Sequence, residues 1–256
     1  MRTNKNNFVS VGTGPGQDRG VICETIDEEA KQQKMSVSLI APTLNEIEAV
    51  KVVIPQINRD WIDEIIIVDG GSTDGTVDFC RQNGCTVYTQ KKKGYGAAMC
   101  EAIQIAKGDL IIEFQPDGNS LPEKIPELIA KINEGYDLVV GSRYKDGAKS
   151  HDDDYLTAIG NRVFTRLVNL AFGSSYTDVL IGYRIFRRDA FKALDIDSMG
   201  LSWAIQLPIR FAKKGFKIAE IPADEPKRIG GVRKMRPFKH GTEFLMVLVK
   251  EMLSRN

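Results

Sequence analysis

The sequence predicts an α/β domain with a mostly parallel central sheet and helices on both of its faces. Two observations carry this prediction. From about residue 35, short apolar runs rich in β-branched residues alternate with helical patterns, and most of these runs end in Asp, Gly or Pro. Strands that are apolar on both faces need cover on both faces, which is typical of parallel sheets joined by crossover helices.

The expected elements follow one another without a linker or an internal repeat. Strands are expected at 36–42, 63–70, 85–90, 109–115 and 137–144, and the last of these would extend the same sheet. Helices are expected between them at 46–57, 73–84, 94–108 and 121–135. The remainder is read as a helix at 155–172, a strand at 183–187, a helix at 202–214, a strand at 216–221 and a helix at 238–254.

The domain organisation follows from this pattern. Residues 1–34 are polar and Gly-rich, then charged, and they show no apolar periodicity, so we expect a mobile arm. Residues 35–240 are expected to form one domain. Residues 241–256 are expected to form a C-terminal amphipathic helix that packs on the domain or meets a membrane or a second subunit.

Composition narrows the class of protein. The 35 basic and 34 acidic residues of the 256 nearly cancel, which argues against a nucleic-acid-binding protein. The four cysteines form no CxxC pair, and the first residues lack the apolar core of a secretory signal. No stretch approaches the roughly 20 apolar residues that span a bilayer. We therefore expect a cytoplasmic protein, with peripheral contact to the inner face of a membrane and a homodimer both left open.

Ligands of such sheets bind beyond the carboxyl ends of the strands, so the loops that follow the strands should hold the site. The first strand ends in Pro42 and Thr43, followed by Asn45 and Glu46 at the start of a helix. These polar groups suit a ligand, although Thr43 and Asn45 are equally suited to capping the helix. The second strand ends in Asp69, a carboxylate able to accept hydrogen bonds from a base or ribose.

The third loop, residues 90–98, combines a lysine run with glycines and a new helix N-terminus. Lys93, Gly94 and Gly96 therefore suit an anionic ligand, because helix N-termini attract negative charge. The alternative for the lysine run is an ordinary solvated face.

The fourth strand is followed by Gln115, Asp117 and Asn119 at a spacing of two residues. Three oxygen-bearing side chains at a strand end suit Mg²⁺ or Mn²⁺, which would bridge a diphosphate. The alternative is a simple Asp-Gly-Asn turn before a helix that begins with Pro.

Seven segments in order resemble the successive motifs of family 2 glycosyltransferases, particularly the branch of dolichol-phosphate mannose synthase and other polyprenyl-phosphate sugar transferases. The segments are PTLNE, VDGGSTDGT, KGYGAA, QPDGN, VVGSRY, DVLIGYRIFRRDAF and RIGGVRKM, between about residues 36 and 240. The resemblance implies a GT-A fold, which is a single Rossmann-like nucleotide-binding domain. It also implies a UDP- or GDP-sugar donor, a divalent metal, and inversion at the anomeric carbon.

The resemblance also implies roles for individual residues. Nucleotide-binding positions would be Pro42, Thr43, Asn45, Glu46, Asp69, Lys93, Gly94, Gly96, Gln115 and Asp117. Gln115, Asp117 and Asn119 match the family's Asp-x-Asp-x-Gln metal motif. Catalytic positions would be Asp117, Arg143, Asp178, Arg228 and Lys234.

Four of these catalytic positions have distinct expected tasks. Arg143 matches an arginine near the acceptor phosphate, and Arg228 and Lys234 match a loop that closes over the donor phosphates. An acceptor phosphate is already an anionic nucleophile, whereas a hydroxyl acceptor needs a general base, for which Asp178 is the candidate. A cap or turn role is the alternative for Asp178.

The sequence departs from the family pattern in four places. Gln115 replaces the first aspartate of the metal motif, and Gly70 replaces the second aspartate of VDDGS. The segment 155–157 stands where the family has an acceptor-side arginine, and no transmembrane helices follow residue 254. A saccharide acceptor in polysaccharide or cell-envelope glycan synthesis is therefore an alternative to polyprenyl phosphate.

Two other functions compete with sugar transfer. A catalytically silent nucleotide-sugar-binding protein is one alternative, motivated by Gln115. A nucleotidyltransferase is a weaker one, because such enzymes carry a Gly-rich basic loop after the first strand, where this chain has PTLNE.

Overall fold

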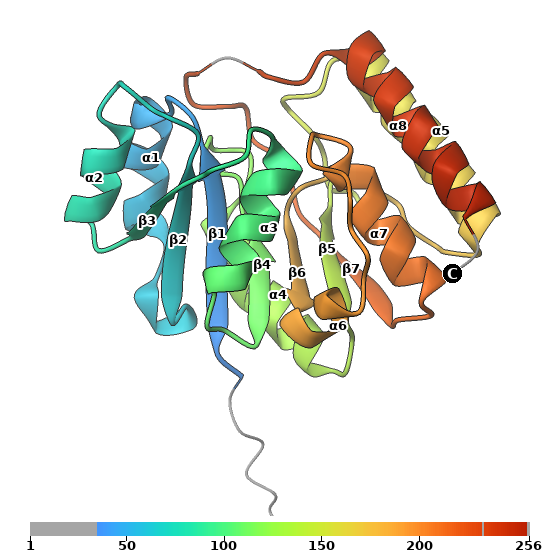
Figure 1. Cartoon of the computed structure of the whole chain (residues 1–256), viewed down its shortest axis with the longest axis horizontal. Coiled ribbons are helices and arrows are strands. Elements are labelled where there is room, and N and C mark those ends of the chain that lie inside the picture. Colours follow the sequence, from blue (N-terminus) through green and yellow to red (C-terminus); the bar gives the residue numbers. More distant parts are fainter. Residues whose placement is uncertain (1–34, 232, 255–256) are drawn as a thin grey trace, which may run out of the picture. The chain divides into compact units, whose positions relative to one another are not determined.

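The computed structural model describes residues 35–231 and 233–254 (Figure 1). The arm predicted for residues 1–34 lies outside the described residues. Residues 35 onward belong to one compact unit.

A seven-stranded sheet forms the centre of this unit. Its order is β3-β2-β1-β4-β6-β5-β7, and β6 runs antiparallel to both of its neighbours while the other pairs are parallel. This confirms the predicted α/β class with a mostly parallel sheet. The strands are β1 (Val37–Thr43), β2 (Glu64–Asp69), β3 (Thr86–Thr89), β4 (Leu110–Glu113), β5 (Leu138–Ser142), β6 (Arg184–Arg187) and β7 (Ile218–Pro222).

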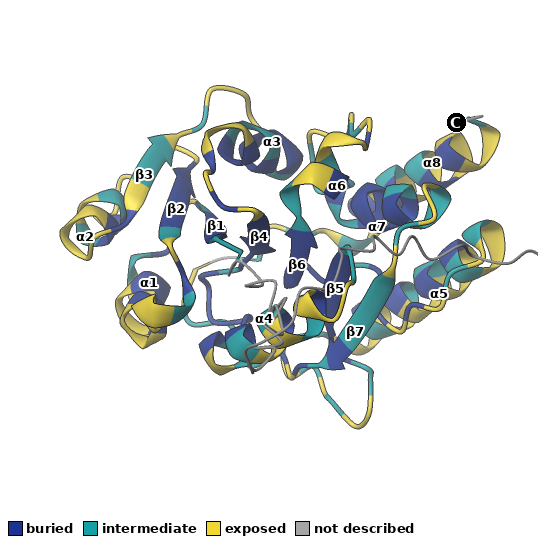
Figure 2. Cartoon of the chain, turned by 90° about the horizontal axis from the view of Figure 1, so that it is seen from below, coloured by how far each residue is buried: buried dark blue, intermediate teal, exposed yellow. Residues whose placement is uncertain are grey.

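Helices cover both faces of the sheet. Figure 2, which looks along the strands, shows α3, α6 and α7 on one face and α1 and α4 on the other. The helices are α1 (Ile47–Val53), α2 (Thr76–Gln82), α3 (Tyr95–Ile105), α4 (Ile125–Asn133), α5 (Tyr155–Phe172), α6 (Arg188–Lys192), α7 (Trp203–Lys213) and α8 (Pro237–Leu253). Short 3₁₀ turns lie at Ile54–Gln56, Arg59–Trp61 and Pro122–Lys124.

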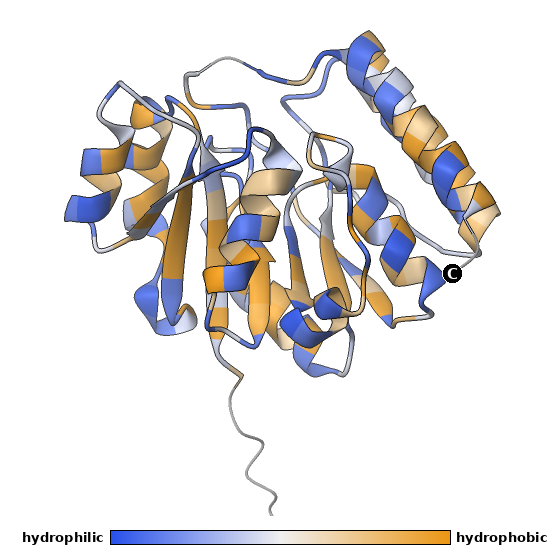
Figure 3. Ribbon diagram, viewed as in Figure 1, coloured by the Kyte–Doolittle hydropathy of each residue, from blue (hydrophilic) through white to orange (hydrophobic). Residues whose placement is uncertain are grey.

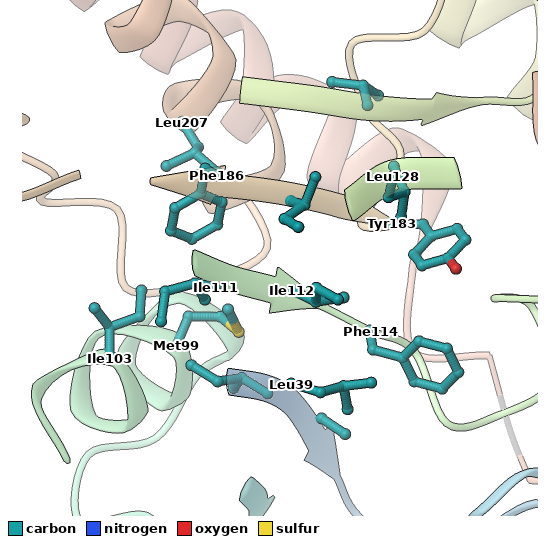
Figure 4. Packing of buried hydrophobic residues seen from close by; sticks show 14 of the residues in the cluster. Leu39, Met99, Ile103, Ile111, Ile112, Phe114, Leu128, Tyr183, Phe186 and Leu207 are labelled. Atoms are coloured by element: carbon teal, nitrogen blue, oxygen red, sulfur yellow. The ribbon is translucent and has the colours of Figure 1, made fainter. Parts of the chain in front are cut away.

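The core lies where the strands meet these helices. Leu39, Ile111 and Ile112 of the central strands are wholly buried, because side chains on both faces of β1 and β4 are covered (Figure 4). Phe114 extends this packing beyond the end of β4, where its ring meets Tyr183 edge to face at 5.7 Å. Large apolar side chains thus form the floor beneath the loops at the carboxyl ends of the strands.

Two placements were not visible in the sequence pattern. β5 joins the same sheet, as predicted, but β6 is inserted between β4 and β5. The last helix, α8, packs mainly against α7 and α5. Among the described residues, no helix is both long and apolar enough to cross a bilayer.

Candidate functional site

A pocket of about 220 Å³ opens at the carboxyl ends of β1 and β4. Its walls come from these strand ends, from the start of α5, from Phe244 on α8 and from residues near 228–235. Several residues predicted from the sequence line it: Pro42, Glu46, Gln115, Asp117, Asn119, Arg143, Arg228 and Lys234. The fold therefore brings together the ends of the first and fourth strands with two distant cationic segments.

Asp117 and Glu46 face two cations that come from far along the chain. Arg228 Nη2 lies 2.7 Å from Asp117 Oδ2, and its Nη1 lies 3.6 Å from Glu46 Oε1. Lys234 Nζ lies 2.8 Å from the same Glu46 oxygen and also donates to the carbonyl of Leu44. Burial raises the pKa of the Asp117 carboxyl, although Arg228 counteracts the shift. We call Arg228, Arg233 and Lys234 the loop cations.

Some buried polar atoms at this end of the sheet have no protein partner. Thr43 Oγ1, Glu46 Oε2 and Arg228 Nε are buried and make no hydrogen bond. An unpartnered buried polar atom costs free energy. Glu46 and Arg228 line the pocket, so their unpartnered atoms indicate a place for ligand or water there.

Arg143 also lines the pocket and is held by three carboxylates. Its Nε and Nη2 donate to the two oxygens of Asp178 at 2.7 and 3.0 Å. Its Nη1 lies 3.0 Å from Asp153 and 3.2 Å from Glu225. Asn161 of α5 donates to Asp178 at 2.6 Å. The guanidinium is thus fixed in position by bonds that use most of its donors.

The pKa values of these carboxyls diverge. Burial of Asp178 opposes its ionisation, but the charge and hydrogen bonds of Arg143 outweigh that cost and lower its pKa. For Glu225, burial dominates over the attraction of Arg143 and raises the pKa. Asp178 is completely buried and does not line the pocket. A base role, predicted for a hydroxyl acceptor, therefore disagrees with this geometry, and positioning of Arg143 agrees with it.

Other predicted site residues lie outside the pocket wall. Asp69 accepts hydrogen bonds from the backbone N–H groups of Gly71 and Ser72, so it stabilises its own turn. Asn45 accepts a bond from the N–H of Thr73. These side chains organise the loops after β1 and β2, which is a structural role that the sequence analysis had weighed for Asn45 but not for Asp69.

At the start of α3, where an anion site was predicted, two backbone N–H groups have protein partners. The N–H groups of Gly96 and Ala97, which would face a phosphate, donate instead to the carbonyls of Gly200 and Met199. A Cβ at Gly96 would overlap the carbonyl oxygen of Ser198, and a Cβ at Gly94 would overlap that of Met199. The glycines are explained by close packing, and neither they nor Lys93 line the pocket.

Sequence reasoning missed several pocket residues. Three of these are acidic side chains that line the pocket: Asp152, Asp153 and Glu225. The hydroxyl of Tyr95, which also lines the pocket, donates a hydrogen bond to the buried Glu113 at 2.8 Å. Burial raises the pKa of Glu113, although Arg184 counteracts it. The Asp152–Asp154 run before α5 was a visible signal. Glu225 carried none, because its partner Arg143 is 82 positions away.

Two of the residues predicted to hold a metal have protein partners in this structure. Asp117 is paired with Arg228, and the amide nitrogen of Asn119 donates to the carbonyl of Pro226 at 2.8 Å. Within residues 35–231 and 233–254, no group of three or more His, Cys, Asp or Glu side chains is placed to bind a metal ion. The guanidinium of Arg228 occupies the carboxylate that a cation would need.

Comparisons with known proteins agree with the fold. The model of "Glycosyl transferase family 2" matches residues 38–195. A dolichyl-phosphate hexose transferase of Haloferax volcanii is 32% identical over 217 residues, covering 84% of this chain and 92% of that protein. A polyprenol monophosphomannose synthase of Mycolicibacterium smegmatis is 27% identical over 211 residues, covering 77% of this chain and 80% of its own length.

A solved structure shows the same architecture. The glucosyl-3-phosphoglycerate synthase of Mycobacterium tuberculosis, solved with Mn²⁺, UDP and phosphoglyceric acid, superposes with a TM-score of 0.70 at 22% identity. The likeness covers 89% of this chain and 82% of that one. The family model spans more than half of the chain, and the neighbours share its sheet and helices. The chain therefore belongs to glycosyl transferase family 2 and is a glycosyltransferase with the GT-A fold.

Proposed function

We propose that this glycosyltransferase moves a sugar from a nucleoside diphosphate sugar to a polyprenyl phosphate, with inversion at the anomeric carbon. The observation that carries the proposal is the meeting of Arg228 and Lys234 with Asp117 and Glu46 at the pocket. Both cations reach a site that also holds unpartnered buried polar atoms. A diphosphate is the kind of ligand that two such cations would bind together.

The chemistry follows from charge. An oxygen of the acceptor phosphate attacks the anomeric carbon while the bond from that carbon to the diphosphate oxygen breaks. The departing nucleoside diphosphate gains negative charge, and Arg228 and Lys234 would stabilise it after exchanging their carboxylate partners for phosphate oxygens. No general base is required, because the acceptor is already anionic. Asp178 would hold Arg143 in place at the wall nearest to α5.

The acceptor is proposed from the names of the relatives. Their names refer to dolichyl phosphate and to polyprenol monophosphomannose. A saccharide acceptor remains the alternative, and it would need a base that Asp178 does not offer in this geometry. Glycan synthesis at the cell envelope is the corresponding setting. A Mg²⁺ or Mn²⁺ ion, bound through Asp117 and the donor phosphates, stays a prediction, and no step above depends on it.

Thermal unfolding with added nucleotides tests the donor site. UDP, GDP and CDP, each with and without Mg²⁺ or Mn²⁺, should be compared at millimolar concentration. The matching nucleotide should raise the melting temperature, because a ligand present at 100 times its Kd stabilises the native state by about 2.7 kcal/mol. With Asp117→Ala, the nucleotide should no longer raise the melting temperature. Asp146→Asn is the control, since Asp146 is exposed and lies outside the pocket.

Turnover separates the proposal from its alternatives. Release of nucleoside diphosphate should require polyprenyl phosphate, and the product should carry the anomeric configuration opposite to that of the donor. A nucleotide that binds without any release would instead indicate a silent nucleotide-sugar-binding protein. The absence of a thermal shift with every nucleotide would contradict the donor site itself.

A further inference from the structure

The helices α5 and α8 bury several polar side chains and expose rows of apolar ones. In a soluble protein the apolar stripe of a surface helix faces the core and the polar side faces water. The inward row of α5 consists of Thr157, Asn161 and Thr165, followed by Val168, all buried. Polar side chains therefore occupy most of the buried positions of this helix, although Phe164 and Phe172 also pack against the core.

The outward row of α5 is apolar along its whole length. Leu156, Ile159, Val163, Leu167 and Leu170 recur at helical spacing and are 38–85% exposed. This row faces away from the buried row, so none of these side chains contributes to the core. Scattered exposed apolar residues are normal, but an uninterrupted row on a helix with a polar inner side marks an interaction surface.

A second apolar row runs along α8. Leu245, Met246, Val249 and Met252 are 46–64% exposed. The buried side of the same helix carries two polar and two apolar side chains: His240, Glu251, Phe244 and Leu248. Glu251 is paired with Arg210 and Lys213 of α7. Figures 1 and 2 show α8 lying beside α5, and Figure 3 shows the hydrophobic stretches along α8. We call the outward rows of both helices the apolar face.

The two helices run in the same direction, and their first turns flank the pocket. Arg233, just before α8, pairs with Asp153 and Asp154, just before α5. Further along, Phe164 and Phe244 meet at 5.7 Å. Asn161 and Phe244 also line the pocket. The apolar face therefore begins beside the pocket and extends away from it.

The charged residues beside the apolar face indicate what kind of surface binds to it. The sequence of α5 contains Arg162 and Arg166 and no acidic residue, and both arginines are exposed beside the outward row. Lys239 is exposed at the start of α8. A second copy of the same face would offer the arginines of α5 no carboxylate from its own α5. A bilayer with anionic headgroups offers both apolar depth and negative charge.

We propose that the apolar face docks this enzyme on the surface of an anionic membrane, with α5 and α8 lying in the interface. This docking does not depend on the proposed donor or acceptor. The occupant is a phospholipid surface, which α5 and α8 enter with their apolar rows while Arg162 and Arg166 meet the headgroups.

Co-sedimentation of the full chain with phosphatidylglycerol vesicles tests the proposal. The wild type should bind these vesicles and bind pure phosphatidylcholine vesicles more weakly. The pair Val163→Gln and Leu245→Gln should weaken binding at least about tenfold, because polar side chains replace buried apolar area. Arg162→Gln and Arg166→Gln should each weaken binding about fivefold at low salt, which is the usual effect of one basic residue at an anionic surface.

Matched controls lie on the other side of the molecule. Val52 of α1 and Ile105 of α3 are 44% and 41% exposed, so Val52→Gln with Ile105→Gln removes similar apolar surface elsewhere. Lys51→Gln is the charge control. The proposal is overturned if the wild type does not bind vesicles, or if the controls weaken binding as much as the test variants. A dimer in sedimentation velocity that dissociates in the Val163→Gln, Leu245→Gln variant would also overturn it, in favour of a second copy.

Discussion

At the scale of single residues, the site consists largely of carboxylates that are paired with the same few cations. Arg143 is bound by Asp178, Asp153 and Glu225, whereas Asp117 and Glu46 share Arg228. Charges removed from water are tolerated only when they are paired and hydrogen-bonded. Removing one member therefore leaves another charge buried without its partner, and the cost should depend on pH in a direction set by the pKa of the group removed.

Asp178→Asn should destabilise the fold by about 3 kcal/mol at neutral pH, the lower end for breaking a buried ion pair, because Asp153 and Glu225 still pair with Arg143. The pKa of Asp178 is lowered in the folded chain, so the unfolded chain binds its proton more tightly. The stabilisation is therefore fully present above the unfolded pKa, near 4, and is lost as pH falls through the lower folded pKa. Urea unfolding between pH 3 and 8 measures this.

The exposed Asp189→Asn is the matched control, since Asp189 forms an ion pair with its neighbour Lys192 at the surface, where such pairs contribute little. It should change the urea midpoint much less than Asp178→Asn does. If the difference in free energy of unfolding between wild type and Asp178→Asn stays constant down to pH 3, Asp178 contributes by packing and not by its charge.

At the scale of elements, the start of α3 shows how packing replaces a ligand. Two N–H groups at this helix end are bound by carbonyls of the segment before α7, and glycines allow the approach. The same features suit a phosphate when only the local sequence is considered. The two explanations make different predictions for an added methyl group, because a ligand site would lose binding whereas a packing site would lose stability.

Gly96→Ala should lower the free energy of unfolding by at least about 2 kcal/mol, because the new Cβ overlaps the backbone at Ser198, which cannot yield as a side chain can. Gly160→Ala in α5 is the matched control. No atom lies within 4 Å of a Cβ at that position, so the change should stabilise the helix by about 0.5–1 kcal/mol. Differential scanning calorimetry compares the two, and equal melting temperatures would contradict the packing role.

Most of the strands and helices could be predicted because their signals are local. β1, β2 and β4 are apolar runs that end at polar residues, and the helix at Tyr155–Phe172 follows its own periodicity. Which strands pair in the sheet, in contrast, does not depend on the local sequence of each strand. Nothing in the segment Arg184–Arg187 indicates that it enters the sheet antiparallel beside β4. Asp69 was assigned to a ligand for a related reason, since a strand-end carboxylate suits a turn and a nucleoside equally well.

At the scale of the whole molecule, one edge of the sheet holds both the pocket and the start of the apolar face. The loop cations come from the segment that joins β7 to α8, so the donor site is continuous in sequence with one of the two helices proposed to meet the membrane. A lipid-linked acceptor would be presented to the pocket at the bilayer surface. Docking should then matter for acceptors held in a membrane and not for acceptors free in solution.

Turnover rates should therefore respond differently to loss of docking when the acceptor is held in a membrane and when it is free in solution. With a long-chain polyprenyl phosphate in anionic vesicles, the Val163→Gln, Leu245→Gln variant should lose about tenfold in rate, in step with its loss of vesicle binding. With a short, water-soluble prenyl phosphate, the same variant should match the wild type, because neither residue lines the pocket. Equal losses with both acceptors would place the effect in the pocket and argue against docking. Activity with neither acceptor in the wild type would contradict the proposed acceptor and leave vesicle binding as the independent measure of the face.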